Sequence, residues 1–277
     1  MGFRVATNVQ SLNAQRALKK MGSTEQTTTA QLASGERITK SSDDSAGLAI
    51  SEKLKANIRS SAQANRNAND GISMIQVAEG GLNEQATILV RLRELAIQAA
   101  SDTVGQTERG YTDMEYQQLK NELERISQTT EFNDVTLLNG QGEKLTFQIG
   151  SGNNEFQDRI DYDTGKVNAT LESLGLADEQ ISTKEGAQGS LEKVDNAINV
   201  VSGQRAELGS LQNRLLITSS NLETSIENMS AANSRIRDVD YAEATAKNTQ
   251  TNIMKQAGIS VLSQANQIPS QALRLIG

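Results

Sequence analysis

The side chains that could do chemistry in this sequence are mainly carboxylates, which gather at two places. Asp43 and Asp44 are adjacent, and Asp158, Asp161 and Asp163 form a short acidic run. Oxygen ligands of this kind suit calcium, but the run lacks the glycine and the terminal glutamate of an EF-hand loop. The pattern therefore predicts a solvated acidic strand and loop.

Other groups that build active sites are missing or badly placed. Gly105, Gly110, Gly140 and Gly142 do not follow a predicted strand and open a helix, so they do not form a phosphate-binding loop. The 277 residues include no His and no Cys. This excludes Ser-His-Asp and Cys-His nucleophiles, Cys/His zinc sites and disulfides. We therefore predict a protein that is not an enzyme and that takes no cofactor or metal.

The composition narrows the class of protein further. Aromatic residues make up only 3% of the chain, and a single Pro leaves long helices uninterrupted. The net charge of −7 argues against binding to nucleic-acid phosphates. Apolar runs stay short of the ~18 residues that a membrane-spanning helix needs, so we expect no membrane insertion. These features favour elongated helical packing over a thick globular core.

Apolar residues at heptad spacing predict a long helix of coiled-coil type in the last third of the chain. A second heptad series, Ala68, Ile75, Leu82, Leu89 and Ala96, predicts a partner helix. A shorter helix around Leu119 to Ile126 should follow a break at 101–112. The residues of the long heptad stripe, which we expect to face an outer core, are Val194, Val201, Leu208, Leu215, Leu222, Met229 and Ile236.

Two weaker helices occupy the ends of the chain, at 5–33 and 245–268, and Pro269 should stop the second one. Each has a thin apolar stripe and would be marginal alone in water. We expect the two stripes to pair as an inner core and to serve assembly. The residues of this predicted pairing are Val5, Val9 and Leu12 at one end, and Val261, Leu262, Ala265 and Ile268 at the other.

Only the region from about 135 to 176 has a β pattern. Alternating apolar residues at 144–149 and 155–162 flank a turn-forming linker at 150–154, which predicts a β-hairpin. Residues 176–190 should form a surface loop. The predicted fold is mainly α: an elongated antiparallel helical bundle or coiled coil, with paired N- and C-terminal helices and a small β-hairpin region.

Six motifs in order resemble those of bacterial flagellins, the proteins of the flagellar filament. The resemblance covers roughly residues 4–140 and 185–277, about four-fifths of the chain. The motifs are QLASGERI at 31–38, DDSAGLAI at 43–50, ANRNANDGIS at 64–73, VRLRELA at 90–96, SRIRDVDYA at 234–242 and VLSQANQIP at 261–269.

The resemblance implies a domain organisation. Residues 1–43 and 238–277 would form the inner-core domain that lines the filament's export channel, and 44–237 the outer-core domain with the hairpin. Only about 45 residues vary in the middle of the chain, so the resemblance is to a short, core-only flagellin. Ser34-Gly35 and Asp44 to Gly47 would supply caps where the helices turn between domains.

The resemblance also implies a surface patch for the innate receptor of animals, Toll-like receptor 5. Arg91, Leu95 and Glu115 align with the determinants of recognised flagellins, whereas Val90 stands where those flagellins usually have a polar residue. The alternative is that Arg91 and Glu115 form salt bridges between helices or between subunits.

Other partners follow from the same resemblance. The chain would be secreted through the flagellar type III export machinery with an export chaperone, would polymerise with its own copies, and would meet the filament cap and hook-junction proteins outside the cell. A hook-filament junction protein, which shares helical ends with flagellin, is the alternative. A flagellin with a metalloprotease insert needs His-Glu-x-x-His, and the sequence has no His.

Overall fold

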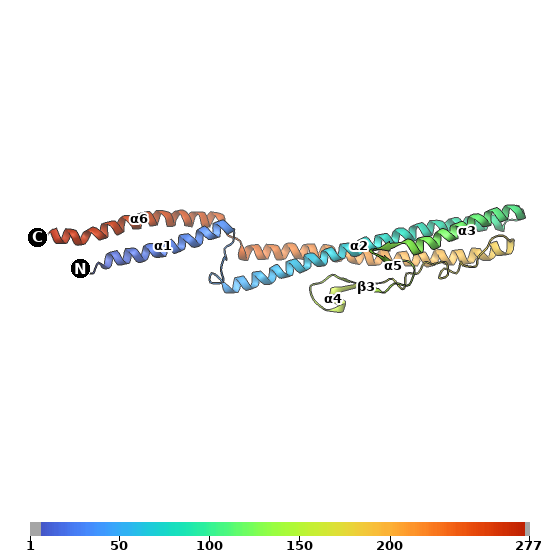
Figure 1. Ribbon diagram of the computed structural model, residues 1–277, viewed down its shortest axis with the longest axis horizontal. Helices are drawn as coiled ribbons and strands as arrows, with labels where there is room; N and C mark the ends of the chain where they lie inside the picture. Colours follow the sequence, from blue (N-terminus) through green and yellow to red (C-terminus); the bar gives the residue numbers. More distant parts are fainter. Residues whose placement is uncertain (1–6, 275–277) are drawn as a thin grey trace. The chain divides into compact units, whose positions relative to one another are not determined.

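The computed structural model describes residues 7–274, with side chains described as far as Gln267. Two compact units divide the chain: one contains residues up to 56 and from 228 onward, and the other contains 57–227. Five long helices account for most of both units (Figure 1). They are α1 (Val9–Ser34), α2 (Ser45–Ala100), α3 (Gln106–Thr129), α5 (Lys184–Arg237) and α6 (Tyr241–Arg274).

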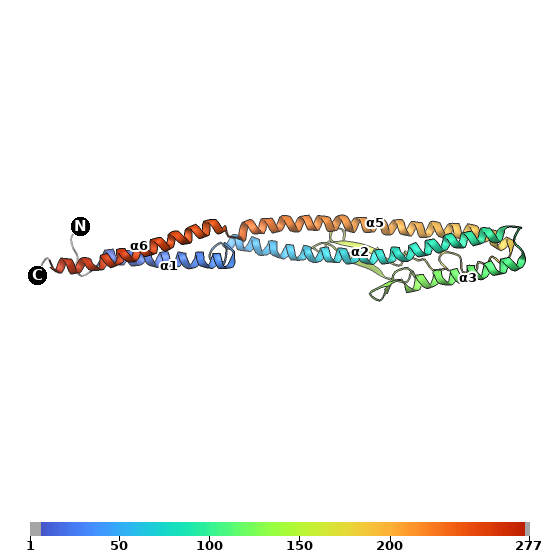
Figure 2. The same cartoon turned by 90° about the horizontal axis from the view of Figure 1, so that it is seen from above.

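In the first unit, α1 and α6 run side by side in opposite directions (Figures 1 and 2). Helix α1 begins behind Asn8, whose side-chain oxygen accepts a hydrogen bond from the Ser11 N–H at 3.0 Å. It ends at Gly35, whose φ of 73° is a left-handed conformation that glycine adopts without strain. Asp44 caps the start of α2 by accepting from the Gly47 N–H at 2.8 Å.

The segments that join α1 to α2 and α5 to α6 bind each other through the backbone. The Arg37 N–H donates to the Arg237 carbonyl at 2.6 Å, and the Val239 N–H donates to the Gly35 carbonyl at 3.0 Å. The Arg237 guanidinium lies between Glu52, at 2.6 Å, and Glu36. The hydrogen bonds that Arg237 donates to Glu52 and Glu36 raise its pKa, so these two connections are held by charge as well as by backbone.

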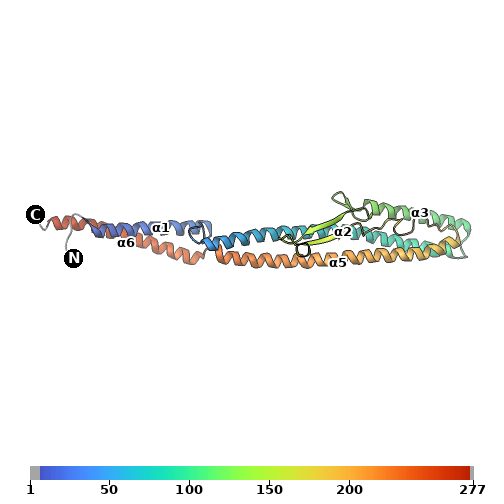
Figure 3. The same cartoon turned by 90° about the horizontal axis from the view of Figure 1, so that it is seen from below.

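The second unit holds the main hydrophobic core, between α2, α3 and α5 (Figures 2 and 3). All five residues of the predicted heptad on α2, from Ala68 to Ala96, are wholly buried. Gln85 lies within this core and donates from its amide nitrogen to the carbonyls of Leu123 on α3 and of Ala169, both at 3.1 Å. The predicted helical bundle is therefore confirmed.

The predicted β-hairpin is present, with one change. Strand β3 (Lys144–Gln148) pairs antiparallel with β4 (Arg159–Asp163), so that Thr146 lies opposite Asp161. Residues 155–158, which we expected to begin the second strand, instead form one helical turn, α4 (Glu155–Asp158). The cause is Asn154, whose side-chain oxygen accepts from the N–H groups of Phe156 and Gln157 and so caps this turn.

A second, smaller hairpin was not predicted. Strands β1 (Glu131–Phe132) and β2 (Val135–Thr136) are joined by Asn133 and Asp134, both with positive φ. Two such residues make the tight turn that matches the twist of paired strands, and Asn and Asp tolerate this conformation best after glycine. The Asn-Asp pair between Phe132 and Val135 was the available signal.

Three predicted boundaries are wrong. The break after α2 covers only residues 101–105, and the predicted surface loop at 176–190 ends where α5 begins, at Lys184. Leu176, Ile181 and Ala187 in that supposed loop are wholly buried. Helix α6 also continues through Pro269, because the Ala265 carbonyl, left without a helical N–H donor by the proline, accepts a hydrogen bond from the Asn8 side chain at 2.8 Å.

Residues 170–181 have no regular structure and are held against α3 by side chains. Asp113 accepts from the Ile181 N–H at 2.7 Å, and the Lys120 ammonium donates to the carbonyls of Ala177 and Glu179, both at 2.9 Å. One face of α3 thus supplies the hydrogen bonds that a neighbouring strand would otherwise make. The α3 residues that contact this segment are Asp113, Gln117, Lys120 and Glu124.

Candidate assembly surfaces

The carboxylates that the sequence singled out have structural roles. Asp43 accepts hydrogen bonds from Thr39 and Lys40, which lower its pKa, and the backbone of Lys40 contributes most. Asp158 accepts from the backbone of the turn at 152–154. Asp161 pairs with Lys144 at 2.8 Å. Within the described residues, no group of three or more Asp or Glu side chains could hold a metal ion.

The most fully buried side chains of α1 and α6 are small or polar. They are Ser11 and Thr28 on α1, and Ala244, Thr251 and Ala265 on α6. Gly258 lies so close to α1 that an added Cβ would approach the Leu18 side chain to 2.9 Å. Lys255 pairs with Glu25 across this contact at 2.7 Å.

Several large apolar side chains of these two helices are exposed instead. Val9 and Leu12 on α1 and Val261 on α6 are each about half exposed. The prediction that they pack against one another within one chain is wrong, because smaller residues occupy the contact. Of the other predicted inner-core residues, Leu262 is half-buried, Ala265 is buried, and Val5 and the side chain of Ile268 lie outside the described part of the chain.

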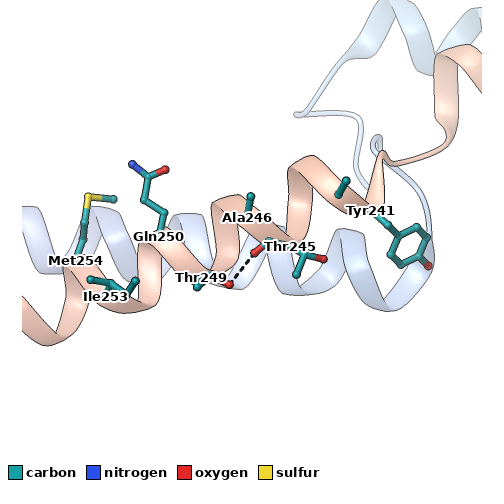
Figure 4. A pocket seen from close by; sticks show the side chains of 8 residues that line it. Tyr241, Thr245, Ala246, Thr249, Gln250, Ile253 and Met254 are labelled. Carbon is teal, nitrogen blue, oxygen red and sulfur yellow. Dashed lines mark hydrogen bonds between the residues drawn. The ribbon is translucent and has the colours of Figure 1, made fainter.

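A shallow groove runs along the exposed side of α6, near its start (Figure 4). Its lining is mostly apolar, and Ile253 and Met254 at one end and Tyr241 at the other are all exposed. Thr249 turns its hydroxyl back to the Thr245 carbonyl at 3.0 Å and so presents its methyl group. This helix therefore presents apolar surface over several turns.

The heptad stripe on α5 is buried for part of its length. Val194, Val201, Leu208 and Leu215 have exposed fractions of at most 1%, and all four belong to the main core. The last three residues of the stripe, Leu222, Met229 and Ile236, are half-buried.

The predicted receptor patch is only partly at the surface. Arg91 on α2 lies 2.8 Å from Glu115 on α3 and 2.9 Å from Glu94, and these carboxylates raise the pKa of Arg91. Leu95 is only 1% exposed and packs in the main core. Its place in a surface patch is therefore wrong, because Leu95 lies with Leu92 and Ala99 on the side of α2 that packs in the core.

Sequence reasoning missed the polar side chains that fix backbone segments, namely the α3 row from Asp113 to Glu124, and Arg237. Polar residues at helical spacing usually indicate a solvated face. The short acidic and basic pattern in 234–240 was the available signal for Arg237, and nothing in the sequence distinguished Lys120 from an exposed lysine. Among the residues described, no helix is long and apolar enough to cross a membrane.

Comparison with known proteins gives consistent matches. Residues 5–143 match the bacterial flagellin N-terminal helical region, and residues 191–276 match the bacterial flagellin C-terminal helical region. The flagellin of Halalkalibacterium halodurans is 42% identical over 269 residues, which cover 97% of this chain and 98% of the relative. The flagellin of Bacillus subtilis is 39% identical over 306 residues, covering 99% and 100%.

Solved structures agree. The crystal structure of Bacillus cereus flagellin matches with a TM-score of 0.50 and 29% identity, covering 61% of this chain and 94% of that one. A putative flagellar hook-associated protein from Vibrio parahaemolyticus matches with a TM-score of 0.58, covering 71% and 100%. It is only 13% identical, so it supports the fold alone.

Long helices, paired chain ends and exposed apolar faces define a helical structural protein. Family models match both helical regions of the chain, and the flagellin relatives align with nearly its whole length. The chain therefore belongs to the bacterial flagellin family. As a flagellin, it is a structural subunit of the bacterial flagellar filament. The alternative of a hook-filament junction protein is not favoured, because the matches of high identity are flagellins.

Proposed function

We propose that the chain polymerises into the filament through the outward apolar faces of α1 and α6. The observation that carries the proposal is that the most fully buried residues of these helices are small or polar, while Val9, Leu12 and Val261 stay exposed. Burial of such side chains between copies would contribute about 25 cal/mol per Å² of apolar area. Contacts between unlike surfaces that do not close into a ring extend into an open filament.

The proposal assigns a role to each part of the chain. Residues 1–43 and 238–277 form the inner core of the filament, and residues 44–237, with the β region at about 135–176, form the outer core. The division into two compact units supports two domains, although the units meet inside α2 and α5, at residues 56/57 and 227/228. The region between α3 and α5 holds only short strands and one helical turn, which fits a core-only flagellin.

Family membership supports the remaining partners. The chain would leave the cell through the flagellar type III export machinery with the help of an export chaperone, and would contact hook-junction and cap proteins at the ends of the extracellular filament. None of these steps asks for catalysis by the chain itself.

Polymerisation can be tested with one charge. Val261→Asp places a carboxylate on the exposed apolar face, where it is solvated in the monomer but would be buried between subunits at a cost of several kcal/mol. We expect monomers with unchanged circular dichroism and no filaments in precipitating salt by electron microscopy. Gln264→Asp, which adds the same charge at an exposed polar position on α6, is the control and should still polymerise. Normal filaments from Val261→Asp would contradict the proposal.

We further propose that Arg91 and Glu115, without Leu95, contribute to recognition of the monomer by Toll-like receptor 5. Their exposure supports this, since both groups can be reached from solvent. The double variant Arg91→Ala with Glu115→Ala should reduce receptor signalling at least severalfold, because charged contacts at an interface carry much of the specificity. Its circular dichroism should match the parent, since an exposed ion pair contributes at most about 1 kcal/mol. Unchanged signalling from a responsive parent would remove the assignment.

A further inference from the structure

The start of α1 and the last turns of α6 are connected through one carboxamide. The Asn8 side-chain oxygen accepts from the Ser11 N–H at 3.0 Å and so caps α1. The nitrogen of the same group donates to the Ala265 carbonyl at 2.8 Å, across 257 positions of sequence.

Ala265 is the residue whose carbonyl needs an outside donor. In a helix the carbonyl of residue 265 accepts from the N–H of residue 269. Residue 269 is proline, which has no N–H. Ala265 is only 4% exposed, so solvent cannot readily replace the missing donor, and an unpaired buried carbonyl is costly. The Asn8 amide supplies that bond.

Other polar pairs also help to set the alignment of α1 and α6. Among the described residues, polar pairs cross this contact at several points along the two helices, and their order is antiparallel. Two of them lie at the Asn8 end, where the Ser11 hydroxyl also donates to the Asn266 side chain at 2.8 Å. The pairs are Asn8 with Ala265, Ser11 with Asn266, Glu25 with Lys255, and Leu32 with Tyr241.

We propose that Asn8 is a shared cap that closes α1 and the proline-interrupted turn of α6 at once, so that the two chain ends become ordered together and in one alignment. Sliding α6 by one residue would leave the Ala265 carbonyl without a donor and Asn8 without its partner. The alignment in turn sets where Val9, Leu12 and Val261 stand relative to one another. The inference rests on the proposed assembly function, in which these side chains meet other copies.

A double-mutant cycle tests the shared cap. Asn8→Asp keeps an N-cap of similar strength but cannot donate to the carbonyl. Pro269→Ala restores the missing N–H, so the Ala265 carbonyl no longer depends on residue 8. The measurement is hydrogen exchange of residues 262–268 in filaments of the full-length chain.

In the parent background we expect Asn8→Asp to speed this exchange on the order of tenfold, as the loss of a hydrogen bond to a buried group implies. In the Pro269→Ala background the same change should speed it severalfold less. Asn8→Ser, a neutral N-cap, repeats the cycle without the new charge. Ser11→Ala, which removes the neighbouring contact to Asn266, should have the same effect in both backgrounds.

If Asn8→Asp and Asn8→Ser each speed exchange equally in the parent and Pro269→Ala backgrounds, the inference is overturned, while the assembly function stays intact. A parent chain that never forms filaments would overturn the assembly function, and the inference with it.

Discussion

At the scale of single residues, Gln85, Lys120 and Thr164 are buried polar groups that bind the backbone of other segments. Lys120 is only 4% exposed, yet it binds two backbone carbonyls rather than a carboxylate. Burial lowers its pKa, the direction expected when an ammonium loses water. Such groups hold irregular segments in place because each one satisfies backbone that would otherwise be unpaired.

Tyr162 on β4 is a buried polar group whose hydroxyl has no hydrogen-bond partner within the described chain. Burial raises the pKa of this hydroxyl from 10.0 to about 12. The folded state therefore holds the proton more tightly than the unfolded state, so stability should fall by about 2 to 3 kcal/mol as the pH rises from about 10 to 12.

The substitution Tyr162→Phe should remove this contribution to the alkaline loss, and at pH 7 it should be neutral or stabilising by about 1 kcal/mol, since an unpaired hydroxyl leaves the core. Urea unfolding of the monomer at pH 7, 10 and 11.5 (chosen to span the pKa, about 10 to 12) measures both effects. Tyr111→Phe, at an exposed position, is the control and should change neither. A clear loss of stability at pH 7 in Tyr162→Phe would mean that the hydroxyl is hydrogen-bonded.

At the scale of elements, burial changes sharply between adjacent residues of the heptad region on α5. Leu215 is wholly buried against α2 and the hairpin, whereas Leu216, the next residue, is 48% exposed. Gly71 on α2 fits this packing, because an added Cβ would approach the side chains of Phe147 on β3 and Leu215 to within 3.1 and 3.3 Å. Helix α5 and strand β3 thus meet over the same glycine.

Leu215→Asp should destabilise the second unit by several kcal/mol, because the new carboxylate is buried without a partner. Leu216→Asp is the matched control: it makes the same chemical change one residue away at an exposed position, and should cost less than about 0.5 kcal/mol. Thermal unfolding of the two monomers, followed by circular dichroism, gives the comparison. Equal melting curves would show that Leu215 does not lie on the core-facing side of α5.

At the scale of the whole molecule, the two compact units differ in how much they depend on other copies. Residues 57–227 contain the main hydrophobic core. The unit that contains both chain ends buries mostly small residues and leaves several large apolar side chains exposed, among them Val9, Leu12 and Val261. We expect residues 57–227 to be stable alone, and the unit with both chain ends to gain most of its stability when other subunits cover it.

Removal of Ile253–Gly277 separates these properties. The truncated chain keeps every residue of the second unit, so it should stay helical and melt near the parent temperature. It loses Val261, Leu262 and Ala265, and with them the partner of α1 from Asn8 to Glu25, so it should not polymerise. Electron microscopy in precipitating salt and circular dichroism measure the two outcomes. Normal filaments from the truncated chain would exclude an inner-core role for these residues.

The sequence by itself determined the long helices, the core heptads of α2 and α5 and the β3–β4 hairpin, because burial of apolar residues at a regular spacing dominates each of them. It also identified the flagellin family, through six motifs that occur in order. Tertiary structure alone decided the rest. Leu95 faces the core, Pro269 does not end α6, and small residues rather than Val9 and Val261 join α1 to α6. These outcomes depend on which group from a distant segment supplies a hydrogen bond or fills a space, and no periodicity along the chain records such a partner.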